Sequence, residues 1–183
     1  MLRSSRTVVL AALFGGSIFA QAPSILVNPD FEQGQAGERP PGWLFGFTPK
    51  LAYSTLTVAD TCYSGKQCAM IRSNVVVPAA GHSFLYQYVD AKPYRGMKFH
   101  FRAAVRTRVS GPPDGAGLLV RIHRDTGGSC FFDNMSERRI NSGDWAFYEI
   151  TGDVCADAYD LELGMQLWGS GVAWMDQCFA RVR

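Results

Sequence analysis

Residues 97–108 read MKFHFRAAVRTR, and this stretch decides the fold class. Its small and apolar side chains recur at every second position, at Phe99, Phe101, Ala103 and Val105. In a β-strand, side chains two positions apart point to the same side of the sheet. The stretch therefore predicts a long strand that buries one side and leaves a polar side open.

The same alternation returns twice toward the C-terminus. The apolar sides of residues 117–124 and 160–168 are formed by Leu118, Val120, Ile122, Leu161, Leu163, Met165 and Leu167. Shorter runs bounded by Gly, Pro, Asn or Asp occupy residues 24–27, 43–47, 51–58, 69–72, 84–90, 145–152 and 172–182. No stretch after residue 22 keeps the 3.6-residue periodicity of a helix. The pattern predicts an all-β chain, an antiparallel β-sandwich or jelly roll, with a single domain over residues 23–183.

Residues 1–22 have the pattern of an export signal. Arg3 and Arg6 precede an apolar stretch over residues 8–19, and the small residues at 20–22 suit a signal peptidase. The apolar stretch is too short to span a bilayer comfortably, and no later one is long enough. We expect a secreted protein, extracellular or periplasmic, with no membrane span.

The charge balance argues against partners that are held by net charge. The sequence has 18 Lys and Arg against 16 Asp and Glu, and loss of Arg3 and Arg6 with the signal peptide leaves 16 of each. A formally neutral domain does not attract nucleic acid or an anionic membrane at long range. We therefore expect neither as a partner.

All five cysteines lie in the part of the chain that is expected to be exported, where disulfides form. Cys62 and Cys68 flank a glycine-containing turn between two predicted strands, so a bridge across the neck of that hairpin is expected. The pairs Cys130–Cys155, Cys155–Cys178 and Cys130–Cys178 all stay open, and one cysteine must be left over. The sequence has no CxxC and no zinc-like histidine spacing, so disulfides are favoured over a metal site.

The polar sides of the three long predicted strands carry the candidate binding residues. If these strands are neighbours, their guanidinium, imidazole, amide and indole groups form one patch. The members of that patch are His100, Arg102, Arg121, His123, Gln166 and Trp168. Such groups suit sugars, because they hydrogen-bond to hydroxyls in pairs and stack on the apolar side of a sugar ring. The alternative is an ordinary solvated sheet face with cross-strand ion pairs.

Several short motifs, taken in order, resemble a known superfamily. They are Leu26-Val27-Asn28-Pro29-Asp30-Phe31-Glu32, Pro41-Gly42-Trp43, Tyr63-Ser64-Gly65-Lys66, Gln87 ahead of Val89-Asp90, Tyr94-Arg95-Gly96 and Trp174-Met175-Asp176. Together they are similar to the galactose-binding-like β-sandwich superfamily, and within it to the xylan- and glucan-binding carbohydrate-binding modules of bacterial glycoside hydrolases. The resemblance spans residues 25–182. It implies a jelly roll that binds sugars on its concave face or at its loop rim.

The resemblance also implies a structural calcium ion near the chain ends. Its ligands, carried over position by position, would be Glu32, Asp176 and Asp30, which supply the hard oxygen atoms that Ca²⁺ takes. The second aspartate that is usual in the last strand is here Gln177, which lowers the negative charge of the site. The alternatives are a turn cap at Asp30 and an arginine partner for Asp176.

The expected function is that of a secreted, non-catalytic protein that binds carbohydrate or another cell-envelope ligand through one face of the sandwich. The sequence lacks Gly-x-Ser-x-Gly, His-Glu-x-x-His and a phosphate-binding loop. Two alternatives remain, a structural or protein-interaction domain of the envelope and a jelly-roll polysaccharide lyase. In a lyase, an arginine neutralises a uronate carboxylate while a histidine or tyrosine moves the proton. The residues with that chemistry are His100, Arg102, Arg121, His123 and Gln166.

Overall fold

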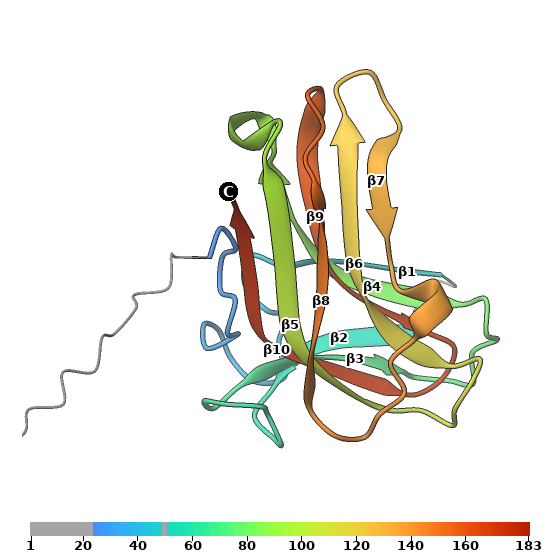
Figure 1. The fold of residues 1–183 in the computed structure, drawn as a ribbon. Coiled ribbons are helices and arrows are strands. Elements are labelled where there is room, and N and C mark those ends of the chain that lie inside the picture. The colour runs from blue at the N-terminus through green and yellow to red at the C-terminus, as the bar shows by residue number, and fades with distance from the viewer. Residues whose placement is uncertain (1–23, 49–50) are drawn as a thin grey trace, which may run out of the picture.

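The computed structural model describes residues 24–48 and 51–183, which form a sandwich of two antiparallel sheets (Figure 1). The strands are β1 (Leu44–Thr48), β2 (Tyr53–Val58), β3 (Cys68–Ser73), β4 (His82–Asp90), β5 (Lys98–Arg108), β6 (Gly115–Arg124), β7 (Ser129–Asp133), β8 (Ala146–Asp153), β9 (Ala158–Trp168) and β10 (Val172–Val182). Short 3-10 helices, η1 (Lys92–Tyr94) and η2 (Ser136–Arg138), are the helical turns of this part. No helix among the described residues has the length and apolar character needed to span a membrane. The predicted all-β sandwich is confirmed, while the predicted signal peptide lies outside the described residues.

Each sheet has five strands. We call them the β9 sheet, with the order β1-β4-β9-β6-β7, and the β10 sheet, with the order β2-β3-β10-β5-β8. β9 and β10 are consecutive in the chain but lie at the centre of different sheets, so the chain crosses from one sheet to the other at residues 169–171. The two C-terminal strands therefore deliver core side chains to the middle of both layers.

The apolar sides of the long strands meet between the sheets. Leu118, Leu161 and Met165 of the β9 sheet are fully buried, as are Phe101 and Val105 of the β10 sheet. Burial of a side chain of this size contributes about 1.5 to 3 kcal/mol. The alternation in the sequence thus selects the core side of these strands correctly.

Two expectations about single strands are wrong. Residues 24–27 form bends rather than a strand, although the backbone N–H of Ile25 donates to the carbonyl of Ala180 at 3.0 Å. β7 has no counterpart among the expected strands, because its sequence SCFFD is short and shows no clear alternation.

The single patch required residues 97–108 to lie beside residues 117–124 and 160–168, and the structure does not meet this condition. β6 and β9 are neighbours in the β9 sheet, but β5 lies in the other sheet, between β10 and β8. All three strands bury one side in the same core, so the polar side of β5 faces away from the polar sides of β6 and β9. Alternation assigns each residue to a side of its strand and carries no information about which sheet the strand joins.

The expected disulfide between Cys62 and Cys68 is confirmed, with a Cα–Cα distance of 5.4 Å. Of the open pairings, the structure contains Cys130–Cys155, which ties β7 to the loop before β9. Cys178 is left over and only 5% exposed, and burial raises the pKa of its thiol well above the ordinary value. A buried, protonated thiol is poorly placed to form a bridge between two chains.

Candidate functional site

The structure divides the predicted binding residues between two opposite surfaces. Four of them lie on the outer face of the β9 sheet: Arg121 and His123 on β6, Gln166 and Trp168 on β9. His100 and Arg102 lie on β5, on the outer face of the β10 sheet. The outer face of the β9 sheet therefore holds most of the candidate residues.

Glu162 is the centre of the outer face of the β9 sheet. In the strand register it lies opposite Tyr88 of β4 and Arg121 of β6. The residue is buried, and its Oε2 lies 3.8 Å from Nη1 of Arg121 and 4.0 Å from Nε2 of His123. Among the described residues this oxygen has no hydrogen-bond partner. A buried carboxylate oxygen without a donor costs free energy, which a ligand hydroxyl can remove.

Burial and the neighbouring basic groups shift the pKa of Glu162 in opposite directions. Burial raises the pKa of Glu162, and the positive charges of Arg121 and His123 oppose that rise. His123 is fixed by Asp160, with 2.6 Å between Nδ1 and Oδ1. Burial, followed by the charge of Glu162, raises the pKa of Tyr88 to about 12, so its phenol keeps the proton that it can donate. Glu162 thus lies in a row with Tyr88, Arg121 and His123, in which its carboxylate is the hydrogen-bond acceptor and the other three side chains are donors.

Exposed aromatic rings border this row. Tyr88 is 49% exposed, and its ring centroid lies 5.3 Å from that of Tyr86 on the same strand. Phe132 of β7 is 51% exposed, and the guanidinium of Arg121 lies 4.6 Å from its ring centroid. Aromatic rings left in water beside polar groups are typical of binding surfaces. Our sequence reasoning missed these rings, although the alternating tyrosines of β4 carry a usable signal.

Gln166 and Trp168 lie at the other end of β9, under the segment that follows β7. The side-chain amide of Asn134 donates to Oε1 of Gln166 at 3.3 Å. The guanidinium of Arg139 lies 4.5 Å from the Trp168 ring centroid, and Trp168 is only 6% exposed. The indole is therefore covered, and its visible role is to hold that segment on the sheet.

His100 and Arg102 make their contacts on the opposite surface. Nε2 of His100 lies 2.9 Å from Oε2 of Glu149, and the guanidinium of Arg102 lies 4.0 Å from the ring centroid of Phe147. Tyr63, from the loop between the first two cysteines, stands edge-on to the same ring with 5.1 Å between centroids. The outer face of the β10 sheet is thus a second polar surface, separate from the row around Glu162.

Two of the three predicted calcium ligands hold the loop of residues 62–68. Asp176 is fully buried, and its Oδ2 accepts a hydrogen bond from the backbone N–H of Ser64 at 3.0 Å. Oε1 of Glu32 accepts from two backbone N–H groups of the same loop, at 2.7 and 3.0 Å. Asp30 instead accepts from the backbone N–H of Glu32 at 3.4 Å. The loop therefore depends on two carboxylates from distant parts of the chain.

The negative charges of Glu32 and Asp176 would suit a bound cation. Burial raises the pKa of Asp176 to about 6 against the backbone hydrogen bonds it accepts, and the charge of Glu32 adds to the rise. Within the described part of the chain, neither carboxylate forms an ion pair, and no three metal-ligating side chains gather. Calcium takes six to eight oxygens, so backbone carbonyls and water would have to supply the rest.

Comparisons with known proteins agree with the observed fold. No protein-family model matches the chain. It is similar to the xylan-binding CBM22-1 domain of Paenibacillus barcinonensis Xyn10C, with a TM-score of 0.59 and 13% identity over 84% of this chain and 90% of that one. It is also similar to TmCBM61 in complex with β-1,4-galactotriose, with a TM-score of 0.54 and 12% identity over 88% of this chain and 100% of that one. The resemblance to the β-sandwich of carbohydrate-binding modules is confirmed as a likeness of fold.

Two other similar proteins are much longer. The enzymatically active domain of tailspike protein 4 from bacteriophage CBA120 has a TM-score of 0.63 and 12% identity over 87% of this chain and 21% of that one. The uncharacterized HTH-type transcriptional regulator YbfP of Bacillus subtilis is 26% identical over 136 residues. That match covers 74% of this chain and 45% of YbfP, so the chain spans less than half of this curated relative. The helix-turn-helix in its name has no counterpart among the described residues, which contain no α-helix.

Proposed function

We propose that the chain binds carbohydrate, without catalysis, through the outer face of the β9 sheet. The observation that carries the proposal is the buried Oε2 of Glu162, which has no donor in the part of the chain that the structure describes and is flanked by Arg121 and Tyr88. A sugar hydroxyl that donates to this oxygen removes the cost of the unmet acceptor. The guanidinium and the phenol can then donate to other sugar oxygens, while the exposed rings pack against the apolar side of the sugar.

A neutral polysaccharide is the ligand class that this face favours. In the row around Glu162, the basic groups of Arg121 and His123 each lie within 4.0 Å of a carboxylate of Glu162 or Asp160. The row around Glu162 therefore has no excess positive charge to attract an acidic polymer. The similar structures named for xylan and for β-1,4-galactotriose support this class of ligand. A glycan array would identify which neutral polysaccharide the protein binds.

The predicted binding residues take different parts in this proposal. Arg121 and His123 contact the sugar directly. Gln166 and Trp168 support the face from beneath the segment after β7, as their burial indicates. His100 and Arg102 belong to the opposite surface and have no role in it.

Affinity gels that contain xylan, β-glucan or galactan test the proposal with two tyrosine variants. Tyr88→Ala removes a 49% exposed ring from the row around Glu162, and Tyr159→Ala removes a 52% exposed ring near the start of β9, where the ammonium of Lys92 lies 5.1 Å from its centroid. We expect at least one gel to retard the parent and Tyr159→Ala but not Tyr88→Ala. Equal retardation of the two variants, or a parent that binds nothing on a neutral glycan array, contradicts the proposal.

We also propose that the protein is secreted and that calcium stabilises the loop of residues 62–68. Two disulfides fit an oxidising compartment, which is where the predicted signal peptide would send the chain. Glu32 and Asp176 would hold the ion, whose positive charge would relieve the repulsion between them. We expect the melting temperature to be several degrees higher in calcium chloride than in chelator, and this difference to vanish in Glu32→Gln. Identical melting curves for the parent in both solutions would rule out the ion.

A lyase reaction is the second candidate, because the structure brings Arg121, His123 and Tyr88 together. The ring centroids of Tyr88 and His123 lie 6.1 Å apart. In such a reaction the His123 imidazole takes the proton from the carbon beside a uronate carboxylate, and the bond between the next carbon and the glycosidic oxygen breaks. The Tyr88 phenol gives that oxygen a proton, and a carbon–carbon double bond forms in the uronate. Absorbance of that product on acidic polysaccharides is the test, and we expect none.

A further inference from the structure

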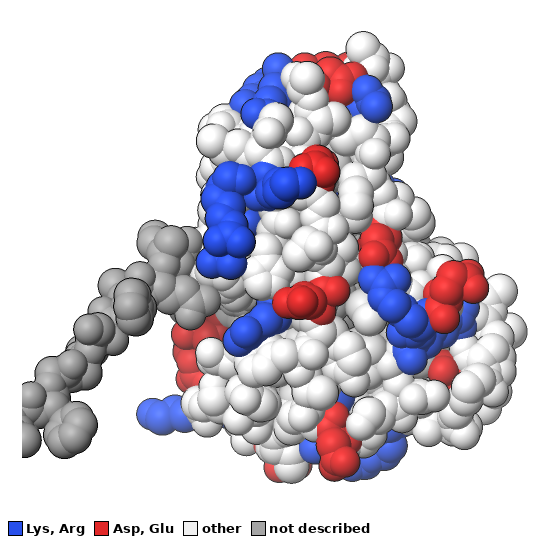
Figure 2. Space-filling model, in the orientation of Figure 1, with Lys and Arg blue, Asp and Glu red and all other residues white. Residues whose placement is uncertain are grey.

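The outer face of the β10 sheet carries cationic side chains that the proposed sugar face does not use. Lys98, His100 and Arg102 alternate along β5, and Arg181 and Arg183 follow at the end of β10. The register places Arg181 opposite His100, and the backbones of Arg183 and Lys98 hydrogen-bond to each other. Figure 2 shows a group of Lys and Arg side chains at the position that Figure 1 gives to the end of β10.

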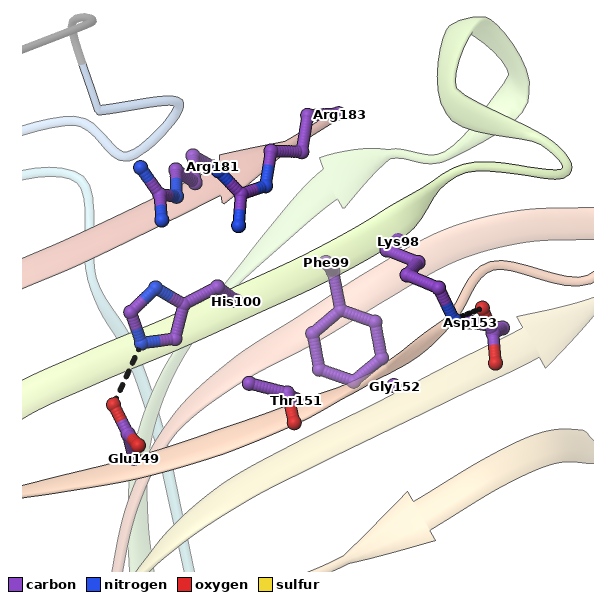
Figure 3. A pocket seen from close by; sticks show the side chains of 9 residues that line it. All are labelled: Lys98, Phe99, His100, Glu149, Thr151, Gly152, Asp153, Arg181 and Arg183. Carbon is purple, nitrogen blue, oxygen red and sulfur yellow. Dashed lines mark hydrogen bonds and ion pairs between the residues drawn. The ribbon is translucent and has the colours of Figure 1, made fainter.

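These side chains line a hollow of about 480 Å³ at one end of the sheet (Figure 3). β10 and the residue after it contribute Arg181 and Arg183, and β8 contributes Glu149, Thr151 and Asp153 on the other side. A hollow of this size lies within the range of small-ligand sites. The hollow has room for a sugar unit between the guanidinium groups of Arg181 and Arg183 and the side-chain oxygen atoms of β8.

The two sets of basic side chains in the hollow differ in their partners. Lys98 and His100 each contact a carboxylate of β8, at 2.7 and 2.9 Å. Figure 3 shows Arg181 and Arg183 across the hollow from Glu149 and Asp153, and no ion pair with a described carboxylate holds either arginine. The buried Nε of Arg181 also lacks an acceptor among the described residues. A buried guanidinium N–H without an acceptor is costly, and an anion placed there would satisfy it.

We propose that this hollow binds an acidic sugar unit of a polysaccharide, with the carboxylate or sulfate of that unit held by Arg181 and Arg183. The planar fork of a guanidinium matches two oxygens of such a group. Glu149 and Asp153 on the facing wall would repel a dense polyanion such as nucleic acid. They can, however, accept hydrogen bonds from hydroxyls, and one anionic group beside several hydroxyls is the pattern of an acidic sugar.

This site is independent of the row around Glu162, because the two lie on opposite outer faces of the sandwich. One ligand is acidic and the other neutral, so each can be measured with its own probe. A polysaccharide with a neutral backbone and acidic substituents would provide a ligand for each site.

Titration calorimetry on the full chain tests the site with an oligogalacturonate and a sulfated dextran. The variant combines Arg181→Gln with Arg183→Gln, and Arg72→Gln is the matched control, since Arg72 is an exposed arginine of β3 in the same sheet. We expect the double variant to bind at least one acidic probe tenfold or more weakly than the parent. The control should stay within twofold of the parent, and both variants should keep neutral-glycan retention.

The probes separate the two acidic groups and the competing partner. Preference for oligogalacturonate assigns the carboxylate, and preference for sulfated dextran assigns the sulfate. Equal losses in the double variant and the control, or tighter binding of single-stranded DNA than of either glycan, would overturn the site, because general charge would then explain the attraction. A parent that binds neither acidic glycan also overturns it. Retardation in affinity gels that contain neutral polysaccharides tests the row around Glu162 separately.

Discussion

At the residue scale, Glu162 gives the outer face of the β9 sheet its chemistry. Alternation in residues 160–168 places this glutamate on the polar side of its strand, and that much follows from the sequence. Its burial, the 3.8 Å between its Oε2 and Nη1 of Arg121, and the lack of a described donor to Oε2 follow from the neighbours that β4 and β6 bring. Those neighbours are distant in sequence, so the single-strand pattern carries no sign of them.

The raised pKa of Glu162 predicts that neutral-sugar binding weakens in acid. The carboxylate form accepts the sugar hydroxyl, so the ligand favours the ionised state, and uptake of a proton opposes binding. Because burial raises the pKa of this group, the loss should begin at a higher pH than for an exposed glutamate, whose pKa is about 4.3. Binding isotherms between neutral and acidic pH should show this fall in the parent and not in Glu162→Gln. A parent whose affinity is the same across that range would remove the carboxylate from the site.

Trp168 should matter for stability more than for binding. Its ring is covered by Arg139 and only 6% exposed, so Trp168→Ala leaves a cavity under the segment after β7. Large-to-small changes of a buried aromatic cost about 3 to 5 kcal/mol. Urea denaturation should show a loss of that size, with retention on the neutral glycan kept wherever the variant is folded. An unchanged unfolding midpoint with lost retention would instead make the indole a ligand contact.

At the element scale, the pairing of β4 with β9 depends on a glycine in a strand interior. Gly164 lies opposite Tyr86 in the register. A Cβ atom added at Gly164 would lie 2.0 Å from the carbonyl oxygen of Leu85 and 2.7 Å from Cα of Tyr86. A side chain does not fit there unless β4 moves, and β4 carries the tyrosines that border the proposed site.

Gly164→Ala should therefore destabilise the sheet and disturb the site together. Overpacking of this kind costs about 1 to 3 kcal/mol. Gly46→Ala in β1 is the matched control, because its added Cβ would meet Phe84 at an ordinary 3.7 Å. Chemical denaturation and neutral-glycan gels on both variants check this. Equal stability of the two variants would mean that β4 and β9 are not packed as described.

The strands differ in how far the sequence predicts them. Long alternating strands such as β5 and β9 are predicted with their buried sides, because the period of two is a local property. β7 escapes detection because five residues without alternation give no such signal. The partner of each strand is set by contacts far apart in sequence, which is why the predicted patch of β5, β6 and β9 divides between two faces.

At the scale of the whole molecule, a nearly neutral chain carries two faces of different charge. The row around Glu162 balances its cations with carboxylates, whereas Arg181 and Arg183 have no carboxylate partner among the described residues. Net charge from composition averages over both faces. It predicts no long-range attraction of polyanions, and it carries no sign of the arginine pair that we propose as an anion site.

The two disulfides should stabilise the sandwich unequally. Cys62–Cys68 closes a separation of 6 residues and Cys130–Cys155 one of 25. In the chain-entropy description, loops of these sizes give about 2 and about 3.5 kcal/mol. Serine pairs in place of each bridge, compared by urea denaturation, should show the larger loss for the second. The reverse order would mean that the short loop, held by Glu32 and Asp176, contributes through its native contacts instead.

The central claim is that neutral sugar binds on the β9 sheet and not on the β10 sheet. Two glutamates test it as a matched pair, because Glu162 and Glu149 each lie beside a histidine, on opposite outer faces. The measurement is titration calorimetry of Glu162→Gln and Glu149→Gln with the neutral oligosaccharide that the parent binds best. We predict at least a tenfold loss of affinity in Glu162→Gln and none in Glu149→Gln. An unchanged affinity in Glu162→Gln together with a loss in Glu149→Gln would contradict the claim.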